Sequence, residues 1–197
     1  MSVEHKMDSS RRTLLIATSA VGGAGVVATA VPFVASLTPS ERAKAAGAPV
    51  EADISDLAPG DMKIVEWRGK PVWIIRRTPE MLASLDKTDA LVVDPESELP
   101  QQPEYARNKH RSINPEYLVT IGICTHLGCS PTEKFRPGAA SGLGDDWPGG
   151  FLCPCHGSYF DLAGRVYRSM PAPTNLEIPP HKYLSATQIL VGEDDKA

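Results

Sequence analysis

The chain has 197 residues, of which 42% are hydrophobic and 22% charged, and its formal net charge is −4. This length allows one domain with its own core plus a short anchor, and the slightly acidic balance argues against a nucleic-acid partner, which favours a basic face. The 18 prolines and 16 glycines favour a loop-rich, mainly β architecture.

The first apolar segment is long enough to cross a membrane. Thr13–Phe33 reads TLLIATSAVGGAGVVATAVPF and contains no charged residue. As a helix it would measure about 31 Å, close to the ~30 Å of a bilayer's hydrocarbon core. We therefore predict a transmembrane anchor over residues 13–37. The alternative is a cleaved secretory signal with AKAAGA (Ala43–Ala48) as its cleavage site, but the length favours an uncleaved span.

The N-terminal residues 1–12 carry a pair of adjacent arginines, Arg11 and Arg12, directly before the apolar segment. A twin arginine in this place is similar to the bacterial Tat export signal. The simpler interpretation is that these charges hold the N-terminus in the cytoplasm. Both interpretations place the rest of the chain outside, in an oxidising compartment where disulfides form.

Residues 38–50, TPSERAKAAGAPV, are polar and alanine-rich, which predicts a flexible tether to a head over residues 51–197. In the head, Met62–Arg77 predicts a β-hairpin that turns at Arg68-Gly69-Lys70. Thr78 and Pro79 then predict the start of a short helix through Leu85.

The rest of the head predicts further strands and loops. We expect strands at Tyr117–Ile123, Ser158–Val166 and Tyr183–Val191, a surface loop at Asp94–Ile113 and a glycine-rich loop at Arg136–Gly150. Single histidines and tryptophans have simpler interpretations: surface histidines at His5, His110 and His181, and packing residues at Trp67, Trp73 and Trp147. Glu193–Asp195 predicts a solvated tail. The predicted fold class is mainly β, an antiparallel head preceded by one transmembrane helix.

Two hexapeptides, CTHLGC (Cys124–Cys129) and CPCHGS (Cys153–Ser158), hold all four cysteines and two of the five histidines. A cysteine nucleophile needs one activated thiol, and haem attachment needs C-x-x-C-H, which is absent. A closed zinc site takes four ligands and would leave two over, and two leftover cysteines would pair with each other. The residues thus suggest four ligands and one disulfide.

The arrangement of the two hexapeptides bears on the metal. Each supplies one cysteine and one histidine at short range, Cys124 with His126 and Cys153 with His156, plus one further cysteine. Two thiolates and two imidazoles suit a 2Fe–2S centre with thiolates on one iron and imidazoles on the other. This pattern therefore favours an iron–sulfur centre over zinc.

The hexapeptides resemble the cluster loops of Rieske iron–sulfur proteins. The anchor, the tether and three motifs are similar to the Rieske subunit of bacterial ubiquinol–cytochrome c reductase. The motifs are EWRGKPVWIIRRT (Glu66–Thr78), DLAGRV (Asp161–Val166) and PAP (Pro171–Pro173). The resemblance implies one 2Fe–2S cluster in a subdomain at about residues 120–175.

The resemblance also implies a role for each residue of the loops. Cys124 and Cys153 would ligate one iron, and His126 and His156 the other. Cys129 and Cys155 would form a disulfide between the loops, and the Ser158 hydroxyl would donate to the cluster.

The function that the resemblance implies is electron transfer from quinol to a c-type cytochrome, as a subunit of a proton-translocating complex. His156 and His126 would be the catalytic residues, with His156 accepting the quinol's hydrogen bond. The implied partners are cytochrome b, a c-type cytochrome, quinol at the cytochrome b interface and the lipid bilayer, in a dimeric complex. The head would be periplasmic and the anchor in the bacterial inner membrane. The alternative is an exported Rieske electron carrier of another oxidase, such as an arsenite-oxidase-like small subunit.

Two positions depart from the family pattern. Met170 stands before PAP where the family usually has glycine, so we expect a modest local rearrangement. Phe160 stands where the family commonly has a tyrosine that hydrogen-bonds a cluster cysteine. The neighbouring Tyr159 should face away from the cluster, because side chains alternate along a strand.

Overall fold

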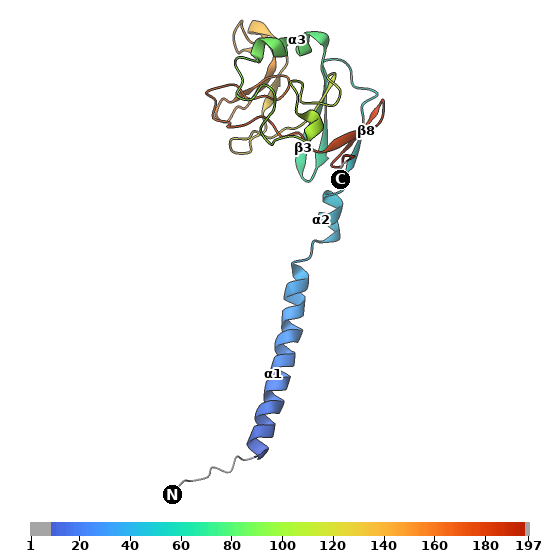
Figure 1. The fold of residues 1–197 in the computed structure, drawn as a ribbon, viewed down its shortest axis with the longest axis vertical. Helices are drawn as coiled ribbons and strands as arrows, with labels where there is room; N and C mark the ends of the chain where they lie inside the picture. The colour runs from blue at the N-terminus through green and yellow to red at the C-terminus, as the bar shows by residue number, and fades with distance from the viewer. Residues whose placement is uncertain (1–8, 196–197) are drawn as a thin grey trace. The chain divides into compact units, whose positions relative to one another are not determined.

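The computed structural model describes residues 9–195, without the side chains of Arg42 and Ala46. His5, predicted to lie on the surface, is outside the described residues. The chain divides into two compact units, one ending at Ala45 and the other beginning at Ala46. We describe each unit by itself (Figure 1).

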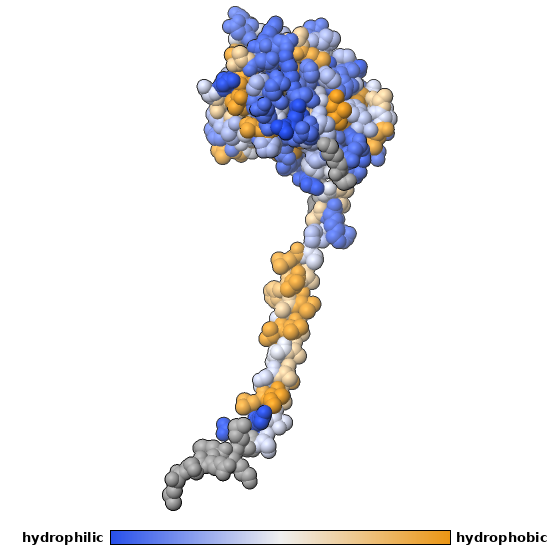
Figure 2. Space-filling model, in the orientation of Figure 1, coloured by the Kyte–Doolittle hydropathy of each residue, from blue (hydrophilic) through white to orange (hydrophobic). Residues whose placement is uncertain are grey.

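The N-terminal unit is dominated by one long helix, α1 (Ser9–Ser36). Within residues 9–195 it is the helix long and apolar enough to cross a membrane, and Figure 2 shows apolar side chains along most of its length. The hydroxyls of Thr13, Thr18 and Thr29 donate to carbonyls four residues earlier. These bonds leave no threonine donor unpaired in an apolar environment. The predicted apolar helix is confirmed, with a start four residues earlier than expected.

A second, short helix, α2 (Glu41–Ala46), lies in the segment predicted to be a flexible tether. The Ser40 hydroxyl accepts a hydrogen bond from the Ala43 N–H at 3.2 Å, as an N-cap residue does. The Lys44 ammonium also pairs with the Glu41 carboxylate at 2.7 Å. The segment is therefore helical in part.

The head contains three antiparallel sheets of three strands each, with strand orders β1-β9-β8, β2-β3-β4 and β5-β6-β7. A helix, α3, follows β3, and two short 3-10 turns, η1 and η2, lie in the loops (Figure 1). The bounds of these elements are β1 (Val50–Asp53), β2 (Met62–Trp67), β3 (Lys70–Arg76), α3 (Pro79–Thr88), η1 (Glu104–Ala106), β4 (Tyr117–Ile121), β5 (Thr132–Lys134), η2 (Gly138–Ser141), β6 (Gly150–Leu152), β7 (Tyr159–Phe160), β8 (His181–Ser185) and β9 (Gln188–Val191). The predicted mainly antiparallel β head is confirmed.

The predicted hairpin is the central feature of the head. β2 and β3 pair in register and turn through Arg68 and Gly69, both with positive φ (52° and 71°), the backbone that a type I′ turn requires. The Arg68 guanidinium carbon lies 4.5 Å from the centre of the Trp67 ring. The helix predicted after Thr78 is also present, as α3, with the Thr78 side chain accepting from the Met81 N–H.

The middle sheet, β2-β3-β4, is covered on both faces. Side chains of β3 alternate between two cores: Trp73 and Ile75 pack in the core toward β5-β6-β7, and Val72 and Ile74 pack in the core toward β1-β9-β8. The three tryptophans are buried, as predicted; they are Trp67, Trp73 and Trp147. The first of these cores also contains Cys124 and Cys153, so the hexapeptides are anchored in packed structure.

Two strand predictions were wrong in extent. Only Tyr159–Phe160 of the predicted Ser158–Val166 strand pairs in a sheet; the Asp161 carboxylate then accepts the backbone N–H groups of Ala163 and Arg165 and turns the chain. Tyr183–Val191 is a hairpin of β8 and β9, because the chain reverses between Ser185 and Gln188.

Two surface predictions were also wrong. Part of the predicted surface loop Asp94–Ile113 is buried, because the Arg111 guanidinium donates to the carbonyls of Ala163, Gly164 and Leu176 inside the head. His181 is only 1% exposed. Its Nδ1 lies 2.9 Å from the Pro179 carbonyl oxygen, and burial lowers the pKa of His181.

Candidate metal centre

The two hexapeptides form two loops with the same backbone closure. Loop 1, Cys124–Cys129, connects β4 to β5, and loop 2, Cys153–Ser158, connects β6 to β7. The N–H of the first residue donates to the carbonyl of the sixth at 2.8 Å in both loops. Each loop is therefore a closed turn presented by a strand.

A glycine completes each loop. The Gly128 N–H donates to the Cys124 carbonyl at 3.1 Å, and the Gly157 N–H donates to the Cys153 carbonyl at 2.9 Å. The two glycines have φ angles of 84° and 75°, in the left-handed region that a side chain disfavours. The sequence needs glycine at these two positions because the last turn of each loop is left-handed.

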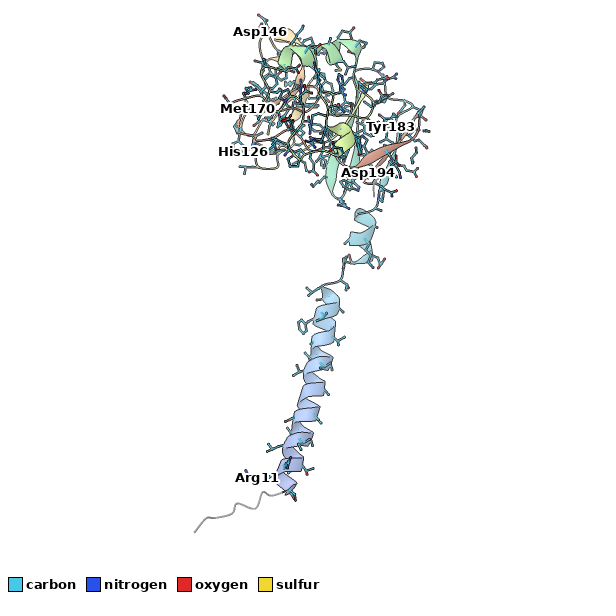
Figure 3. The ribbon with its side chains drawn as sticks, viewed as in Figure 1. Arg11, His126, Asp146, Met170, Tyr183 and Asp194 are labelled. Carbon is cyan, nitrogen blue, oxygen red and sulfur yellow. A yellow bond between two sulfur atoms is a disulfide. The ribbon has the colours of Figure 1, made fainter. Side chains whose placement is uncertain are left out.

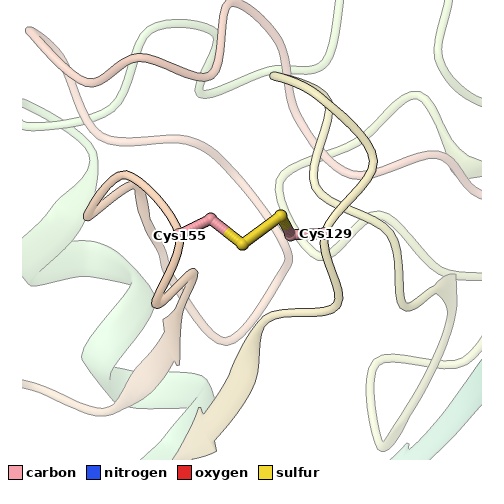
Figure 4. Close-up of a disulfide and its surroundings, with 2 residues drawn as sticks. All are labelled: Cys129 and Cys155. Carbon is pink, nitrogen blue, oxygen red and sulfur yellow. A yellow bond between two sulfur atoms is a disulfide. The ribbon is translucent and has the colours of Figure 1, made fainter.

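The four sulfur atoms fall into two kinds. Cys129 and Cys155 form a disulfide with a sulfur–sulfur distance of 2.12 Å and a Cα–Cα distance of 6.6 Å (Figure 4), so the predicted bridge between the loops is confirmed. Cys124 and Cys153 are free thiols, each 2% exposed. The Cys153 sulfur lies within 4.8 Å of both disulfide sulfurs. The loops thus place two free, buried thiols beside the bridge that ties them together.

The two loop histidines meet edge to face. The ring centres of His126 and His156 lie 4.6 Å apart, with an angle of 85° between the ring planes. The Nδ1 of His126 is buried and has no hydrogen-bond partner within the described residues, whereas His156 is exposed. In Figure 3, His126 lies at one edge of the head together with Met170.

These residues fit a metal cluster. Burial raises the pKa of the Cys124 thiol, and the neighbouring Cys153 raises it further, so Cys124 resists ionisation unless a cation stabilises its thiolate. An unpaired buried imidazole nitrogen costs stability unless it finds a partner. Two sulfur and two imidazole donors are the set that suits a 2Fe–2S centre with mixed ligands.

A third segment, residues 170–174, is tied to both loops. The Ala172 N–H donates to the buried Ser158 hydroxyl at 3.0 Å, and the Ser158 side chain lowers the pKa of the Cys124 thiol, against the larger effect of burial. On the other side, the Thr125 hydroxyl donates to the Thr174 carbonyl at 2.7 Å. The contribution of Thr125 was not predicted from the sequence, which gives no signal for a bond to a residue 49 positions away.

The two aromatic residues after Ser158 point to different surroundings. Phe160 is fully buried in the core that contains Cys124 and Cys153. Tyr159 packs instead against Trp147 and Tyr167, with ring centres 5.4 and 6.2 Å away. The prediction that Tyr159 faces away from the loops' thiols is confirmed.

The two loops are joined by a disulfide and present two buried thiols and two histidines. This arrangement defines an iron–sulfur head of the Rieske class. In agreement, a protein-family profile described as "Rieske [2Fe-2S] domain" matches residues 48–180. A second profile, described as "Ubiquitinol-cytochrome C reductase Fe-S subunit TAT signal", matches residues 1–40. The predicted Tat signal is thereby confirmed, and together with the apolar helix it indicates a membrane-anchored, exported head.

Relatives that match nearly the whole chain identify its family within the Rieske class. The chain is 62% identical over 194 residues to the ubiquinol–cytochrome c reductase iron–sulfur subunit of Allochromatium vinosum, covering 98% of this chain and 93% of the relative. It is 42% identical to the subunit of the same name from Blastochloris viridis, covering 98% of each chain. It is 41% identical to that from Bradyrhizobium diazoefficiens, covering 92% of this chain and 93% of the relative. The chain belongs to the family of ubiquinol–cytochrome c reductase iron–sulfur subunits.

Proposed function

We propose that this chain is the electron-transfer subunit of a quinol–cytochrome c oxidoreductase, and that it takes electrons from quinol and passes them to a c-type cytochrome. The observation that carries the proposal is the meeting of two buried free thiols with two histidines at the disulfide-joined loops. Family membership over nearly the whole chain supports it, since the relatives are named as subunits of this enzyme.

The ligands of the cluster in this proposal are Cys124, His126, Cys153 and His156. Burial of both thiols supports the sulfur ligands, and the unpaired Nδ1 of His126 supports an imidazole ligand. When bound, a 2Fe–2S cluster with two histidine ligands accepts one electron at a higher potential than an all-thiolate cluster does.

The two histidines have unequal roles in the proposal. His156 is exposed, so its free ring nitrogen can accept a hydrogen bond from a quinol hydroxyl and hold the proton. His126 is half-buried, and it orients the pair through the edge-to-face contact with His156. Ser158 stabilises the thiolate of Cys124 by donating its hydroxyl.

The remaining chain serves membrane attachment. Residues 1–12 carry the export signal, residues 13–37 form the anchor, and residues 38–50 join it to the head at 51–197, whose cluster-binding part spans about residues 120–175.

The partners in this proposal are cytochrome b, a c-type cytochrome, and quinol bound at the cytochrome b interface, in a dimeric complex. The anchor lies in the bacterial inner membrane, with the N-terminus cytoplasmic and the head periplasmic.

Purification of the tagged full chain from membranes tests this function against an exported carrier of another oxidase. We expect b-type haem to copurify in fixed ratio to the chain, with quinol-dependent reduction of cytochrome c in the same fraction. A His156→Gln chain should still copurify with the haem and lose the activity. A chain that is isolated with its cluster but without b-type haem, or without this activity, would contradict the proposal.

A further inference from the structure

The arrangement of sulfur atoms around Cys153 allows a reaction besides metal binding. The sulfurs of Cys129, Cys153 and Cys155 all lie within 4.8 Å of one another. Two of these sulfurs form the disulfide in Figure 4, and the third is a free thiol. A free thiol held beside a disulfide is the arrangement from which thiol–disulfide exchange proceeds.

We propose that Cys153 exchanges with the Cys129–Cys155 disulfide whenever the head holds no cluster, so that cluster insertion has to precede the oxidation that makes this disulfide. In the exchange, the Cys153 sulfur forms a new bond to one disulfide sulfur as the old sulfur–sulfur bond breaks. The departing cysteine takes up the proton that Cys153 gives up. The number of thiols and disulfides is unchanged, so no oxidant or reductant is consumed.

We assign the attack to Cys153 because its sulfur lies close to both disulfide sulfurs. Cys124 and Cys153 are both buried and free, but the group of sulfurs within 4.8 Å of one another does not include Cys124. Cys155 is exposed, so a thiol released there reaches solvent. Because exchange moves Cys153 into a disulfide, the resulting isomer has lost one of its two free buried thiols.

The protective role of the cluster rests on the proposed function, because it requires Cys153 to be a ligand. A ligated thiolate is not free to attack, so a loaded head keeps its native disulfide. The reaction that oxidises Cys129 and Cys155 would then act on a head that is already loaded. The match to a Tat signal marks this chain for export. The chain reaches the oxidising compartment only after export, which agrees with cluster insertion before disulfide formation.

A matched pair of variants tests the exchange without using activity. Full-length Cys124→Ser and Cys153→Ser chains each lack one proposed ligand and keep one free thiol beside the native pair. Each chain is brought to equilibrium in a glutathione redox buffer in detergent, trapped with an alkylating reagent and mapped by mass spectrometry. Iron analysis of the same samples reports on the ligand assignment separately.

We expect the alkyl label in Cys153→Ser only at Cys124, with the Cys129–Cys155 disulfide intact. In Cys124→Ser, we expect label at Cys129 or Cys155 as well, because Cys153 enters a disulfide. Label confined to Cys153 in the second variant would overturn the proposal. Equal exchange in both variants would also overturn it, since position would then favour neither thiol.

The wild-type chain gives a second test that starts from the native disulfide. Loaded chain is stripped of iron by an anaerobic chelator, and samples are alkylated over time beside loaded chain. We expect label at Cys129 or Cys155 to appear only after iron removal. Label that stays confined to Cys124 and Cys153 would overturn the exchange. Retained iron in both variants above would instead contradict the ligand set of the proposed function.

Discussion

The two loops of the metal centre have the same backbone and a different order of side chains. Both close by a hydrogen bond from the first residue's N–H to the sixth residue's carbonyl, and both have a left-handed glycine in fifth place. The histidine is third in loop 1 and fourth in loop 2, and the disulfide cysteine is sixth in loop 1 and third in loop 2. The shared backbone therefore places the first cysteine of each loop, Cys124 or Cys153, in the same position. The different order of side chains determines which residues of each loop face solvent.

Exposure is where the loops differ most. In loop 1, the Nδ1 of His126 is buried, and Leu127 at the tip is 71% exposed. In loop 2, four consecutive residues, 154–157, are exposed, and they include Cys155 and His156. Loop 1 therefore exposes an apolar side chain at its tip, whereas loop 2 exposes a histidine.

Replacing a ligand should have the largest effect, and it should be equal in the two loops. We expect Cys124→Ser, Cys153→Ser, His126→Gln and His156→Gln each to lose the cluster, because each removes one of the four ligands of iron in the proposed function. Iron content should fall from about two per chain to near zero, as measured by elemental analysis and by the electron paramagnetic resonance signal.

His110→Gln is the matched control for the histidine ligands. The Nδ1 of His110 is also buried without a partner within residues 9–195, but His110 lies outside the loops. This variant should keep about two irons per chain. A stable cluster after loss of any one loop ligand would show that the two loops do not contribute equally.

Removing the disulfide should weaken the connection between the loops without removing a ligand. Cys129→Ser combined with Cys155→Ser opens a bridge between positions 26 residues apart. The free energy of unfolding should fall by about 3 kcal/mol, because the unfolded chain regains the entropy of the closed loop. Denaturant titration gives the free energy, and the decay of the cluster's visible absorbance should become faster. Unchanged stability and unchanged decay would show that packing alone holds the loops together.

The two loop glycines allow a symmetric test of the shared backbone. Gly128→Ala and Gly157→Ala should each cost about 1 kcal/mol, because alanine disfavours a left-handed backbone. Apart from its chain neighbours, an added Cβ meets no atom of residues 9–195 within 4 Å at either position, so the cost should come from the backbone alone and be similar in both loops. Thermal unfolding of the two variants measures it, with Leu127→Ala as an exposed control. A large difference between the two glycine variants would contradict the equivalence of the loops.

The sequence predicted the parts of the centre whose signals are local. Resemblance to the family pointed to the disulfide, which is present, while the ligands indicated by the spacing of cysteines and histidines stay a prediction. The hairpin at Arg68 and Gly69 followed from alternating apolar residues around a glycine turn. Each of these signals is carried by a short motif, even though the disulfide itself joins two motifs 26 residues apart.

What the sequence did not predict depends on contacts between distant segments. His181 is buried because β8 packs beside Tyr105, whose hydroxyl accepts the His181 N–H from 76 residues away. Arg111 is buried because its guanidinium donates hydrogen bonds to backbone carbonyls more than 50 residues away along the chain. The strand expected at Ser158–Val166 ended early because the Asp161 carboxylate accepts backbone N–H groups and turns the chain. Asp161 is a local turn signal, but the apolar residues around it favoured the prediction of a strand.

The smallest predicted effect concerns the residue that leaves loop 2 into β7. Phe160 belongs to the same core as Cys124 and Cys153, and we expect the hydroxyl of a tyrosine there to lie near the thiolates. Such a donor stabilises the reduced cluster more than the oxidised one, because reduction adds negative charge. If about half of a ~2 kcal/mol hydrogen bond to a charged group differs between the redox states, the midpoint rises by some tens of millivolts. We therefore expect Phe160→Tyr to raise the midpoint in a redox titration.

Tyr159→Phe is the matched control for that titration, because it removes a hydroxyl from the neighbouring position. Tyr159 packs against Trp147 and Tyr167, so its loss should leave the midpoint unchanged. The opposite pattern, a lower midpoint in Tyr159→Phe and no change in Phe160→Tyr, would mean that Tyr159 turns toward the cluster when the cluster is bound. That result would make Tyr159, at the exit of loop 2, a hydrogen-bond donor to the cluster.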